Sequence, residues 1–217
     1  MTIELFAHPF SSYCQKVLIA FYENDTPFTW RMLEDPGVGE EFASLWPIKR
    51  FPIVRENRRV VMEASTVIEY LQLHHPGAVK LIPEDPDLAL EARMLDRFFD
   101  NYVMTPQGKF VLDALRPPEA RDPHGVEEAR QMLNTSYAWL DQRMQGRTWA
   151  VGETFTLADC AAAPSLFYAD WTHRIPGHYE NLTAYRQRLL QRPSFARAVD
   201  EARRFRPYFP LGAPDRD

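Results

Sequence analysis

The order of apolar runs in the first 80 residues constrains the fold of this chain more than any other feature of its sequence. Short strand-like runs alternate there with longer runs of helical periodicity, which is the pattern of an α/β layer. The expected strands are residues 3–7, 28–33, 51–55 and 59–63, and the expected helices are residues 12–24, 37–46 and 65–75. A turn at Glu56 and Asn57 joins the last two strands, so the predicted order is β-α-β-α-β-β-α.

A proline-rich stretch at residues 76–87, "PGAVKLIPEDPD", separates this part of the chain from the rest. Its three prolines and weak periodicity favour a stiff linker. Beyond it, apolar residues recur at steps of three and four, which places them on one face of a helix. Such faces are Leu88, Ala92, Leu95, Phe99 and Tyr102 in one helix, and Val126, Ala129, Leu133, Tyr137, Leu140 and Met144 in the next. We expect an α/β domain at residues 1–77, a linker at 78–87 and an all-helical domain at 88–217.

Two helix starts in the second half of the chain carry capping residues. Asp122 precedes a proline, an order that supplies both a cap and a first-turn proline. Thr156 and Asp159 stand three residues apart and form a short-armed variant of the capping box. Phe155 and Cys160 are placed for the apolar contact that accompanies such a box. We therefore expect Asp159 to have a structural role.

The charge and cysteine content argue against several classes of protein. A formal net charge of −5 disfavours nucleic acid or an anionic membrane as the main partner, since both select clustered positive charge. The arginines of residues 185–206 recur at helical spacing, as in a solvated helix face. Cys14 and Cys160 lie far apart, unlike a disulfide scaffold, and no stretch resembles a signal or membrane segment. The sequence predicts a soluble cytoplasmic protein.

Residues 10–17, "FSSYCQKV", place two hydroxyls at the expected start of a helix. Ser11, Ser12, Tyr13 and Cys14 have the outline of the glutaredoxin CPYC motif with its first sulfur replaced by oxygen. The free amides and the dipole of a helix N-terminus favour negative charge. With Ser11 at this position, the protein can donate a hydrogen bond to a thiolate that a ligand supplies.

The energies involved are sufficient for such a role. A thiol with a pKa of about 8.5 in water must drop by roughly two units to be mainly ionised at neutral pH, and each unit is about 1.4 kcal/mol. A charge-assisted hydrogen bond contributes about 1.5 to 3 kcal/mol. One hydroxyl together with the helix dipole is therefore enough to ionise the thiol of a bound ligand.

The chain closely resembles the glutathione S-transferase family over essentially its whole length. The resemblance lies in five stretches taken together: "FSSYCQKV", "KRFPIV", "MEASTVIEYL", the proline-rich linker and "FTLADCAAAP". It implies a thioredoxin-like N-terminal domain, an all-helical second domain, and a homodimeric cytosolic glutathione transferase with a role in detoxification. In the serine-type members, a serine at the position of Ser11 orients and ionises the glutathione sulfur.

This resemblance makes Ser11 the catalytic candidate and Ser12 a second hydroxyl that can replace it. A serine that only caps the helix has the same sequence pattern, so this structural interpretation stays open. Tyrosine-type members use a tyrosine near the end of the first strand, where this chain has none. We interpret Tyr13 as a packing or access residue and Cys14 as a buried small apolar residue.

The resemblance also assigns residues to the middle and the glycine end of glutathione. "RFPIV" matches the cis-proline element of the family, which implies a cis bond between Phe51 and Pro52. The Phe51 backbone would then pair with the cysteinyl part of glutathione like an added strand. Lys49, favoured over Arg50, can neutralise the glycine carboxylate. A solvated loop charge is the alternative.

The stretch "MEAST" departs from the family pattern at the γ-glutamyl end. Family members commonly have Glu followed directly by Ser, whereas here Glu63 is in register, Ala64 stands at the serine position and Ser65 follows one residue later. Glu63 can pair with the ammonium group, and the amides of the helix start can bind the carboxylate. The role of Ser65 is open, and simple capping by Glu63 and Ser65 is the alternative.

An apolar electrophile is expected between the two domains, against the first long helix of the second domain. The candidate pocket residues are Phe10, Tyr13, Phe98, Tyr102, Met104, Phe110, Tyr168 and Trp171. Such stripes also occur in protein cores, so the prediction concerns the region.

Other chemistries lack the residues they need. His74 and His75 are adjacent rather than helically spaced, and the other four histidines have no matching cysteine or carboxylate pattern, so no metal is expected. No glycine-rich phosphate loop is present. The serine pair is similar to the maleylacetoacetate isomerase branch of the family, whereas a thiol-disulfide oxidoreductase would lack its attacking sulfur. Outside enzymes, a non-catalytic binding or assembly module with the same fold is the alternative.

Overall fold

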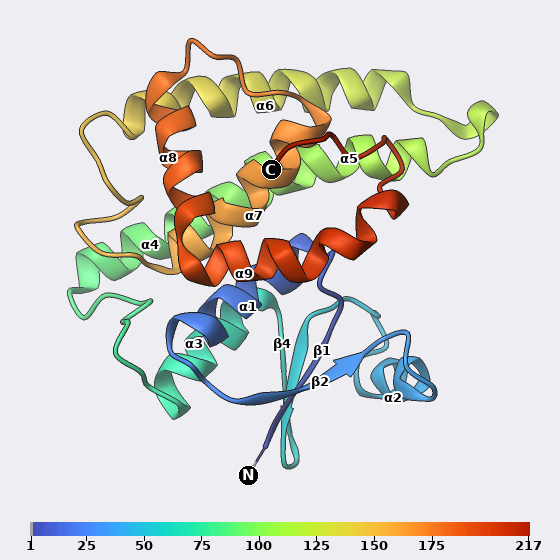
Figure 1. The fold of residues 1–217 in the computed structure, drawn as a ribbon, viewed down its shortest axis with the longest axis vertical. Coiled ribbons are helices and arrows are strands. Elements are labelled where there is room, and N and C mark those ends of the chain that lie inside the picture. The colour runs from blue at the N-terminus through green and yellow to red at the C-terminus, as the bar shows by residue number, and fades with distance from the viewer. Residues whose placement is uncertain (1) are drawn as a thin grey trace.

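The computed structural model describes residues 2–217 and contains each strand and helix expected in the first third of the chain (Figure 1). They are β1 (Ile3–Ala7), α1 (Ser12–Glu23), β2 (Phe28–Met32), α2 (Val38–Leu45), β3 (Ile53–Glu56), β4 (Arg59–Met62) and α3 (Ala64–His74). The strands form one sheet in the order β2-β1-β3-β4, in which β2 runs parallel to β1 and β3 runs antiparallel to both of its neighbours. This arrangement is the expected thioredoxin-like domain.

The hairpin between β3 and β4 turns one residue later than expected. Glu56 pairs with Arg59, so Asn57 and Arg58 are the turn residues. Asn57 has a φ of 56°, in the left-handed region that asparagine tolerates better than most residues. The apolar pattern cannot locate this turn, because all residues from 55 to 59 are polar.

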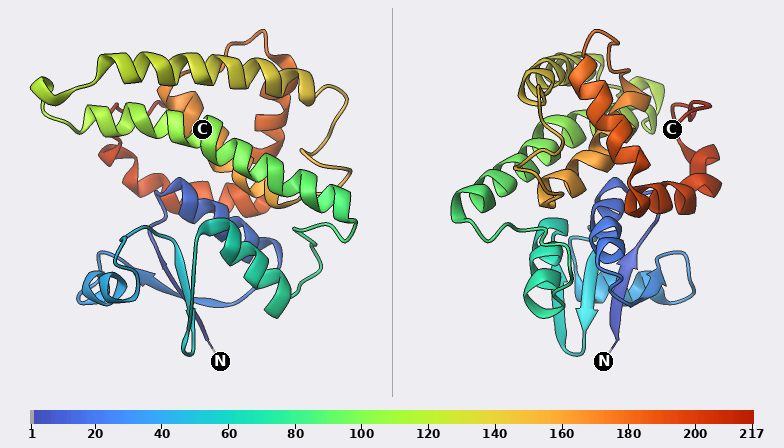
Figure 2. Two further views of the ribbon diagram at one scale, coloured as in Figure 1. Left: turned by 180° about the vertical axis from the view of Figure 1, so that it is seen from behind. Right: turned by 60° about the vertical axis from the view of Figure 1, so that its left-hand side comes forward.

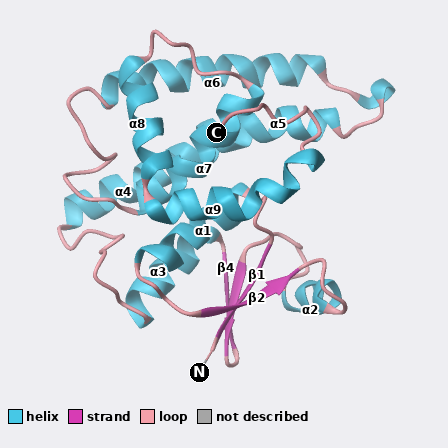
Figure 3. Ribbon diagram, in the orientation of Figure 1, coloured by secondary structure: helices cyan, strands magenta, loops and turns pink. Residues whose placement is uncertain are grey.

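The rest of the chain is helical, as predicted. Its elements are α4 (Pro86–Phe98), the π-helical segment η1 (Phe99–Met104), α5 (Thr105–Ala114), the short turn η2 (Pro118–Ala120), α6 (Pro123–Arg143), α7 (Leu157–Thr172), α8 (Glu180–Gln191), α9 (Pro193–Ala202) and the 3-10 segment η3 (Arg203–Tyr208). Figure 3 shows all strands in one half of the molecule and these helices gathered in the other. Within residues 2–217, no helix has both the length and the apolar character needed to cross a membrane.

Helix α1 lies between the two halves of the molecule (Figure 1). Every residue from Cys14 to Phe21 is buried, because α3 packs on one side of α1 while α7 and α9 pack on the other sides. Arg192 pairs with Glu23 at 2.5 Å and ties the end of α1 to the start of α9. The helix that carries both candidate serines is therefore fixed by both domains.

The first long helix of the second domain is interrupted between α4 and α5. Pro106 has no N–H to donate to the carbonyl of Tyr102, and the hydroxyl of Ser136 on α6 donates to that carbonyl at 2.8 Å instead. The hydroxyl of Thr105 donates to the carbonyl of Asp100 at 2.9 Å. The π-helical turn at this place shifts the helical register and so changes which side chains face α1.

Both predicted caps in the helical half are confirmed. The Asp122 carboxylate accepts a hydrogen bond from a backbone amide in the first turn of α6. At the start of α7, Asp159 accepts from the amide of Thr156 at 2.8 Å, from the amide of Ala150 at 2.9 Å and from the hydroxyl of Tyr185 at 2.6 Å. Asp159 therefore joins the start of α7 to α8 and to the loop before α7.

The apolar face expected on the first long helix is only partly buried. Ala92, Leu95 and Phe99 are buried, whereas Leu88 and Tyr102, at the two ends of this face, are 38% and 46% exposed. Tyr102 lies within the π-helical turn, where its ring packs 5.4 Å from that of Phe98, beside a hollow against α6. Leu88 lies in the first turn of α4, at the end of the helix farthest from α5.

Candidate functional site

The turn between β1 and α1 is held by hydrogen bonds from several directions. The amide of Ser11 donates to the carbonyl of His8 at 3.0 Å, and the amide of Phe10 donates to Nδ1 of the His8 ring at 3.1 Å. Nε2 of the same ring lies 3.1 Å from Oε1 of Glu34. The hydroxyl of Tyr168 on α7 donates to the carbonyl of Phe10 at 3.2 Å. These bonds fix the backbone around Ser11 before a ligand arrives.

Ser11 is the cap of α1. Its backbone is extended, with φ −91° and ψ 126°, and its hydroxyl oxygen accepts a hydrogen bond from the amide of Cys14 at 3.4 Å. This bond uses a lone pair of the oxygen, so the hydroxyl proton, which also lies within hydrogen-bond reach of the Cys14 thiol, can be donated to a ligand. Capping and donation to a thiolate are therefore compatible in one side chain. Ser12 is the first helical residue, and both serines are partly exposed.

The thiol of Cys14 and the phenol of Tyr13 are both protonated at neutral pH. Burial raises the pKa of Cys14 to about 12, and its sulfur accepts a hydrogen bond from the amide of His8 at 3.4 Å. Burial, followed by the charge of Asp100, raises the pKa of Tyr13 to about 12. This agrees with the interpretation of both residues as packing residues.

The start of α3 is the second part of the candidate site. The bond between Phe51 and Pro52, just before β3, is cis, as the resemblance implies. Glu63 precedes α3 in the left-handed region, with φ 65°, and its side chain is exposed. Ala64 is the first helical residue and is buried. The exposed carboxylate of Glu63 is therefore close in sequence to the unpaired amides of the first turn of α3.

Charged groups from three further segments surround Tyr13. Besides Asp100 on η1, the charge of Glu63 raises the pKa of this phenol and the charge of Arg50 lowers it. The start of α3 and the loop before the cis bond thus carry charges that act on the phenol of Tyr13 in the first turn of α1. Lys49, the cation favoured from sequence, is exposed with φ 56°. Arg50 is the neighbouring cation whose charge reaches Tyr13.

Ser65 is turned into the protein interior. Its hydroxyl donates to Oδ2 of Asp96 at 2.7 Å and accepts from Nζ of Lys16 at 3.0 Å. The same ammonium group lies 2.5 Å from Oδ1 of Asp96 and 2.8 Å from Oδ2 of Asp100. Protein partners therefore occupy the hydroxyl of Ser65, a glutathione-binding candidate whose role the sequence left open. The Ser65 amide remains in the first turn of α3.

We call Lys16, Ser65, Asp96 and Asp100 the ion cluster, and sequence reasoning missed it. The side chains of Lys16 and Asp96 are each 1% exposed. The available signals were a lysine inside the apolar run of α1 and two aspartates four residues apart. Helical periodicity cannot pair them, because 80 to 84 positions of sequence separate the lysine from the two aspartates.

The eight expected pocket residues do not line one cavity. Three of them pack beside Ser11: the ring of Phe10 lies 5.7 Å from that of Tyr168 and 6.4 Å from that of Trp171. Phe209 from the C-terminal tail joins this group, 6.3 Å from Phe10. The indole N–H of Trp171 is buried and has no hydrogen-bond partner among the described residues.

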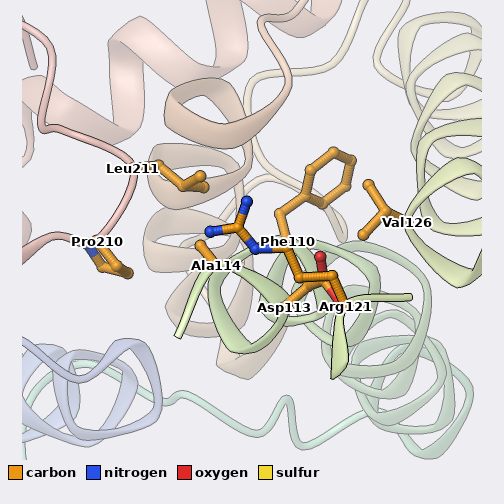
Figure 4. Close-up of a pocket in the computed structure, with 7 residues that line it drawn as sticks. All are labelled: Phe110, Asp113, Ala114, Arg121, Val126, Pro210 and Leu211. Atoms are coloured by element: carbon orange, nitrogen blue, oxygen red, sulfur yellow. The ribbon is translucent and has the colours of Figure 1, made fainter. Parts of the chain in front are cut away.

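The other pocket candidates lie elsewhere. Phe98 and Tyr102 line a hollow of about 270 Å³ against α6. There the ring of Phe98 lies 4.4 Å from that of Trp139. Phe110 lies in a second hollow beside the C-terminal tail (Figure 4). Met104 is buried in the core. The π-helical turn explains this division, because residues on either side of it follow different faces of the helix.

Among the described residues, no group of three or more histidine, cysteine, aspartate and glutamate side chains is arranged to hold a metal ion. Near Ser11 and Glu63, the chain offers backbone amides at two helix starts, the carboxylate of Glu63 and the guanidinium of Arg50.

Two family models match this chain, one on each domain. The model described as "Glutathione S-transferase, N-terminal domain" matches residues 5–78, and the model described as "Glutathione S-transferase, C-terminal domain" matches residues 103–193. Together they span the candidate site and most of the helices that pack on α1.

Curated relatives cover nearly the whole chain at low identity. FtsZ-localized protein A of Caulobacter vibrioides is 25% identical over 207 residues, which covers 90% of each chain. Glutathione S-transferase GstB of Escherichia coli K12 is 23% identical over 208 residues, covering 91% of this chain and 97% of the relative. Maleylacetoacetate isomerase of Dictyostelium discoideum is 22% identical over 174 residues, covering 78% and 79%.

Solved structures share the two-domain arrangement. A glutathione S-transferase from Methylobacterium radiotolerans in complex with glutathione sulfonate superposes with a TM-score of 0.79 at 26% identity. The match covers 92% of this chain and 95% of that chain. The order of a thioredoxin-like domain and an all-helical domain is thus the same in both proteins.

Proposed function

Because this chain belongs to the glutathione S-transferase family, we propose that it binds glutathione at the first turns of α1 and α3 and adds the ionised thiol to an apolar electrophile. The observation that carries this proposal is the turn at Ser11, which hydrogen bonds hold in place. The hydroxyl of Ser11 caps α1 and can donate its proton to a ligand. The two buried, unpaired cysteines fit a reducing cytoplasmic compartment.

Glutathione lies across the cis bond in this proposal. The backbone of Phe51 pairs with the cysteinyl part of the tripeptide, as an extended peptide pairs with a strand edge. Glu63 binds the γ-glutamyl ammonium, and the amides of Ala64 and Ser65 bind the adjacent carboxylate. Arg50, assisted by Lys49, neutralises the glycine carboxylate.

Thiolate stabilisation is the chemical role of α1. The hydroxyl of Ser11 donates to the sulfur, and the N-terminus of α1 adds a favourable dipole. The rigid turn holds the donor in place, so no reorganisation is needed when the charge forms. Phe10, Trp171 and Phe209 offer an apolar surface for the electrophile beside the sulfur.

Replacing Ser11 with alanine should lower the rate of glutathione conjugation to 1-chloro-2,4-dinitrobenzene about 10- to 100-fold at pH 6.5, because the thiolate loses a hydrogen bond of about 1.5 to 3 kcal/mol. The measurement is kcat/KM for glutathione, compared with that of Ser12→Ala. Ser12→Ala should stay within about threefold of wild type. A larger loss in Ser12→Ala than in Ser11→Ala would transfer the role to Ser12.

A glutathione-binding module without catalysis is the second candidate. FtsZ-localized protein A, one of the relatives above, is named for its localisation rather than for an enzyme activity. Two measurements separate the candidates. Calorimetric titration gives the affinity for glutathione, and ultraviolet titration gives the pKa of the bound thiol. An enzyme should bind glutathione and lower the pKa of its thiol. A module would bind it only at millimolar concentration or would leave the thiol pKa unchanged. Conversion of maleylacetoacetate in the presence of glutathione would favour the isomerase alternative.

A homodimer is part of the proposal. Leu90, Met94, Phe98 and Tyr102 follow one another at four-residue steps along α4 and η1, and the last two of them line a mainly apolar hollow against α6. The left view of Figure 2 shows these helices side by side on one face of the molecule. An apolar stripe of this kind on a soluble protein marks an association surface.

Replacing Tyr102 with aspartate should shift the protein from a dimer, at twice the chain mass of 25.3 kDa, to a monomer. A charge in the centre of an apolar interface weakens association at least tenfold, roughly 1.4 kcal/mol or more. The measurement is light scattering after gel filtration. Tyr208→Asp, at a site 76% exposed on η3, is the control and should remain dimeric. A monomeric wild type would rule out the dimer.

A further inference from the structure

A hollow of about 250 Å³ lies between α5, the start of α6 and the C-terminal tail (Figure 4). Phe110 of α5, Val126 of α6 and Leu211 of the tail form its apolar walls. We call it the tail pocket. Its volume suits a ligand smaller than a typical drug molecule, such as a bicyclic aromatic compound.

The walls of the tail pocket are held by packing and by ion pairs. The ring of Phe110 stacks on His173, with centroids 6.4 Å apart, and the guanidinium of Arg130 lies 5.4 Å from the centre of the Phe110 ring. Arg216 pairs with Asp170 at 3.0 Å and fastens the end of the tail to α7. The Phe110 wall and the end of the tail are therefore fixed before a ligand binds, which lowers the entropic cost of binding.

Two charged side chains line the tail pocket, and only one of them has partners. The carboxylate of Asp113 accepts a hydrogen bond from the amide of Asp122 at 2.7 Å and lies 3.8 Å from the guanidinium of Arg116. The side chain of Arg121 makes no hydrogen bond or ion pair with any residue from 2 to 217. Figure 4 shows its guanidinium extending into the pocket, toward the wall that α5 and the tail form.

Neighbouring cations behave differently. Lys109 pairs with the cap of α6, and Arg130 pairs with Glu127 at 3.2 Å. Arg121 instead makes no ion pair with a described residue, and the carboxylate of Asp113 in the same pocket pairs with Arg116. A guanidinium in this position matches a planar carboxylate through two parallel hydrogen bonds.

We propose that the tail pocket binds a small aromatic carboxylate, whose ring system packs against Phe110 and Leu211 and whose carboxylate pairs with Arg121. Binding at this place requires no glutathione, since no lining residue belongs to the turn at Ser11 or to the start of α3. The tail connects the two places, because Phe209 packs on Phe10 and the next two residues of the chain line the pocket.

The test is calorimetric titration of the full chain with 2-naphthoate and with its neutral analogue 2-naphthamide, both without glutathione. Wild type should bind 2-naphthoate about tenfold more tightly than 2-naphthamide. In Arg121→Gln this preference should disappear, while the affinity for 2-naphthamide stays unchanged. Arg58→Gln, a charge change in the exposed hairpin turn, is the matched control and should retain the preference.

A second variant locates the aromatic ring. Leu211 is 45% exposed, so Leu211→Ser should fold normally and weaken the binding of both compounds about threefold or more. The proposal is overturned if wild type binds the two compounds equally, if neither binds at millimolar concentration, or if Arg121→Gln retains the preference for 2-naphthoate. Each of these outcomes leaves the proposed glutathione chemistry untouched, because that chemistry is measured separately by the conjugation rate.

Discussion

Replacing Lys16 with methionine should lower the free energy of unfolding by about 3 to 5 kcal/mol, because the interior of the ion cluster would keep two carboxylates without the ammonium that pairs with them. Methionine fills a volume similar to that of lysine, so little of the loss should come from a cavity. The measurement is urea unfolding at pH 7.5, followed by circular dichroism. Lys80→Met, at an exposed position, is the control and should change stability by less than about 0.5 kcal/mol.

The pH dependence of the Lys16 variant follows from Asp100. Burial raises the pKa of Asp100, and the charge of Lys16 acts in the opposite direction. Without Lys16 the folded-state pKa rises further above its unfolded value, so the folded variant holds a proton that the unfolded chain releases. The free energy of unfolding of the variant should therefore fall as the pH rises from acidic values to neutrality. A loss at pH 5 as large as that at pH 7.5 would contradict this account.

Replacing Asp159 with alanine should cost about 3 to 5 kcal/mol, the second large effect. The side chain is fully buried and accepts from the amides of Ala150 and Thr156 and from the hydroxyl of Tyr185. Together with the hydroxyl of Thr156, removing it leaves four buried donors without a partner, and each such donor costs about 1 to 3 kcal/mol before relaxation. Loss of the cap of α7 adds to this.

Two variants show whether these bonds cause the loss. Asp159→Asn keeps one acceptor oxygen and should be destabilised less than Asp159→Ala. Asp122→Ala removes the cap of α6 at a more exposed place and should cost clearly less. All variants are compared by their urea midpoints. The comparison holds when the slope of unfolding free energy against urea concentration is the same in each variant. Equal losses in Asp159→Ala and Asp122→Ala would show that Asp159 acts as a simple cap.

The secondary structure was largely predictable from sequence, because local patterns determine it. The strand and helix of residues 3–24 follow from one change of apolar periodicity, and the start of α7 follows from the spacing of Thr156 and Asp159. The cis bond at Pro52 was predictable only from the family resemblance, because a proline in a sequence is rarely cis.

The parts that were not predictable depend on tertiary structure. Lys16 and Asp100 are charged residues that sequence rules place in solvent, yet they pair in the interior across a domain boundary. Tyr102 is 46% exposed at the π-helical turn, where Pro106 has no amide to donate and Ser136 of α6 donates to the Tyr102 carbonyl instead. Arg121 was not considered because a single arginine in a loop has no pattern, and its place in the tail pocket depends on the fold of the tail.

The central claim is that the hydroxyl of Ser11 stabilises a thiolate carried by bound glutathione. Ultraviolet titration of the protein-bound thiol, read at the thiolate absorbance near 240 nm, measures this directly. Relative to a free thiol pKa of about 8.5, wild type should show a decrease of about two units, and Ser11→Ala should recover one to two of them. Equal pKa values for the bound thiol in wild type and Ser11→Ala would contradict the claim.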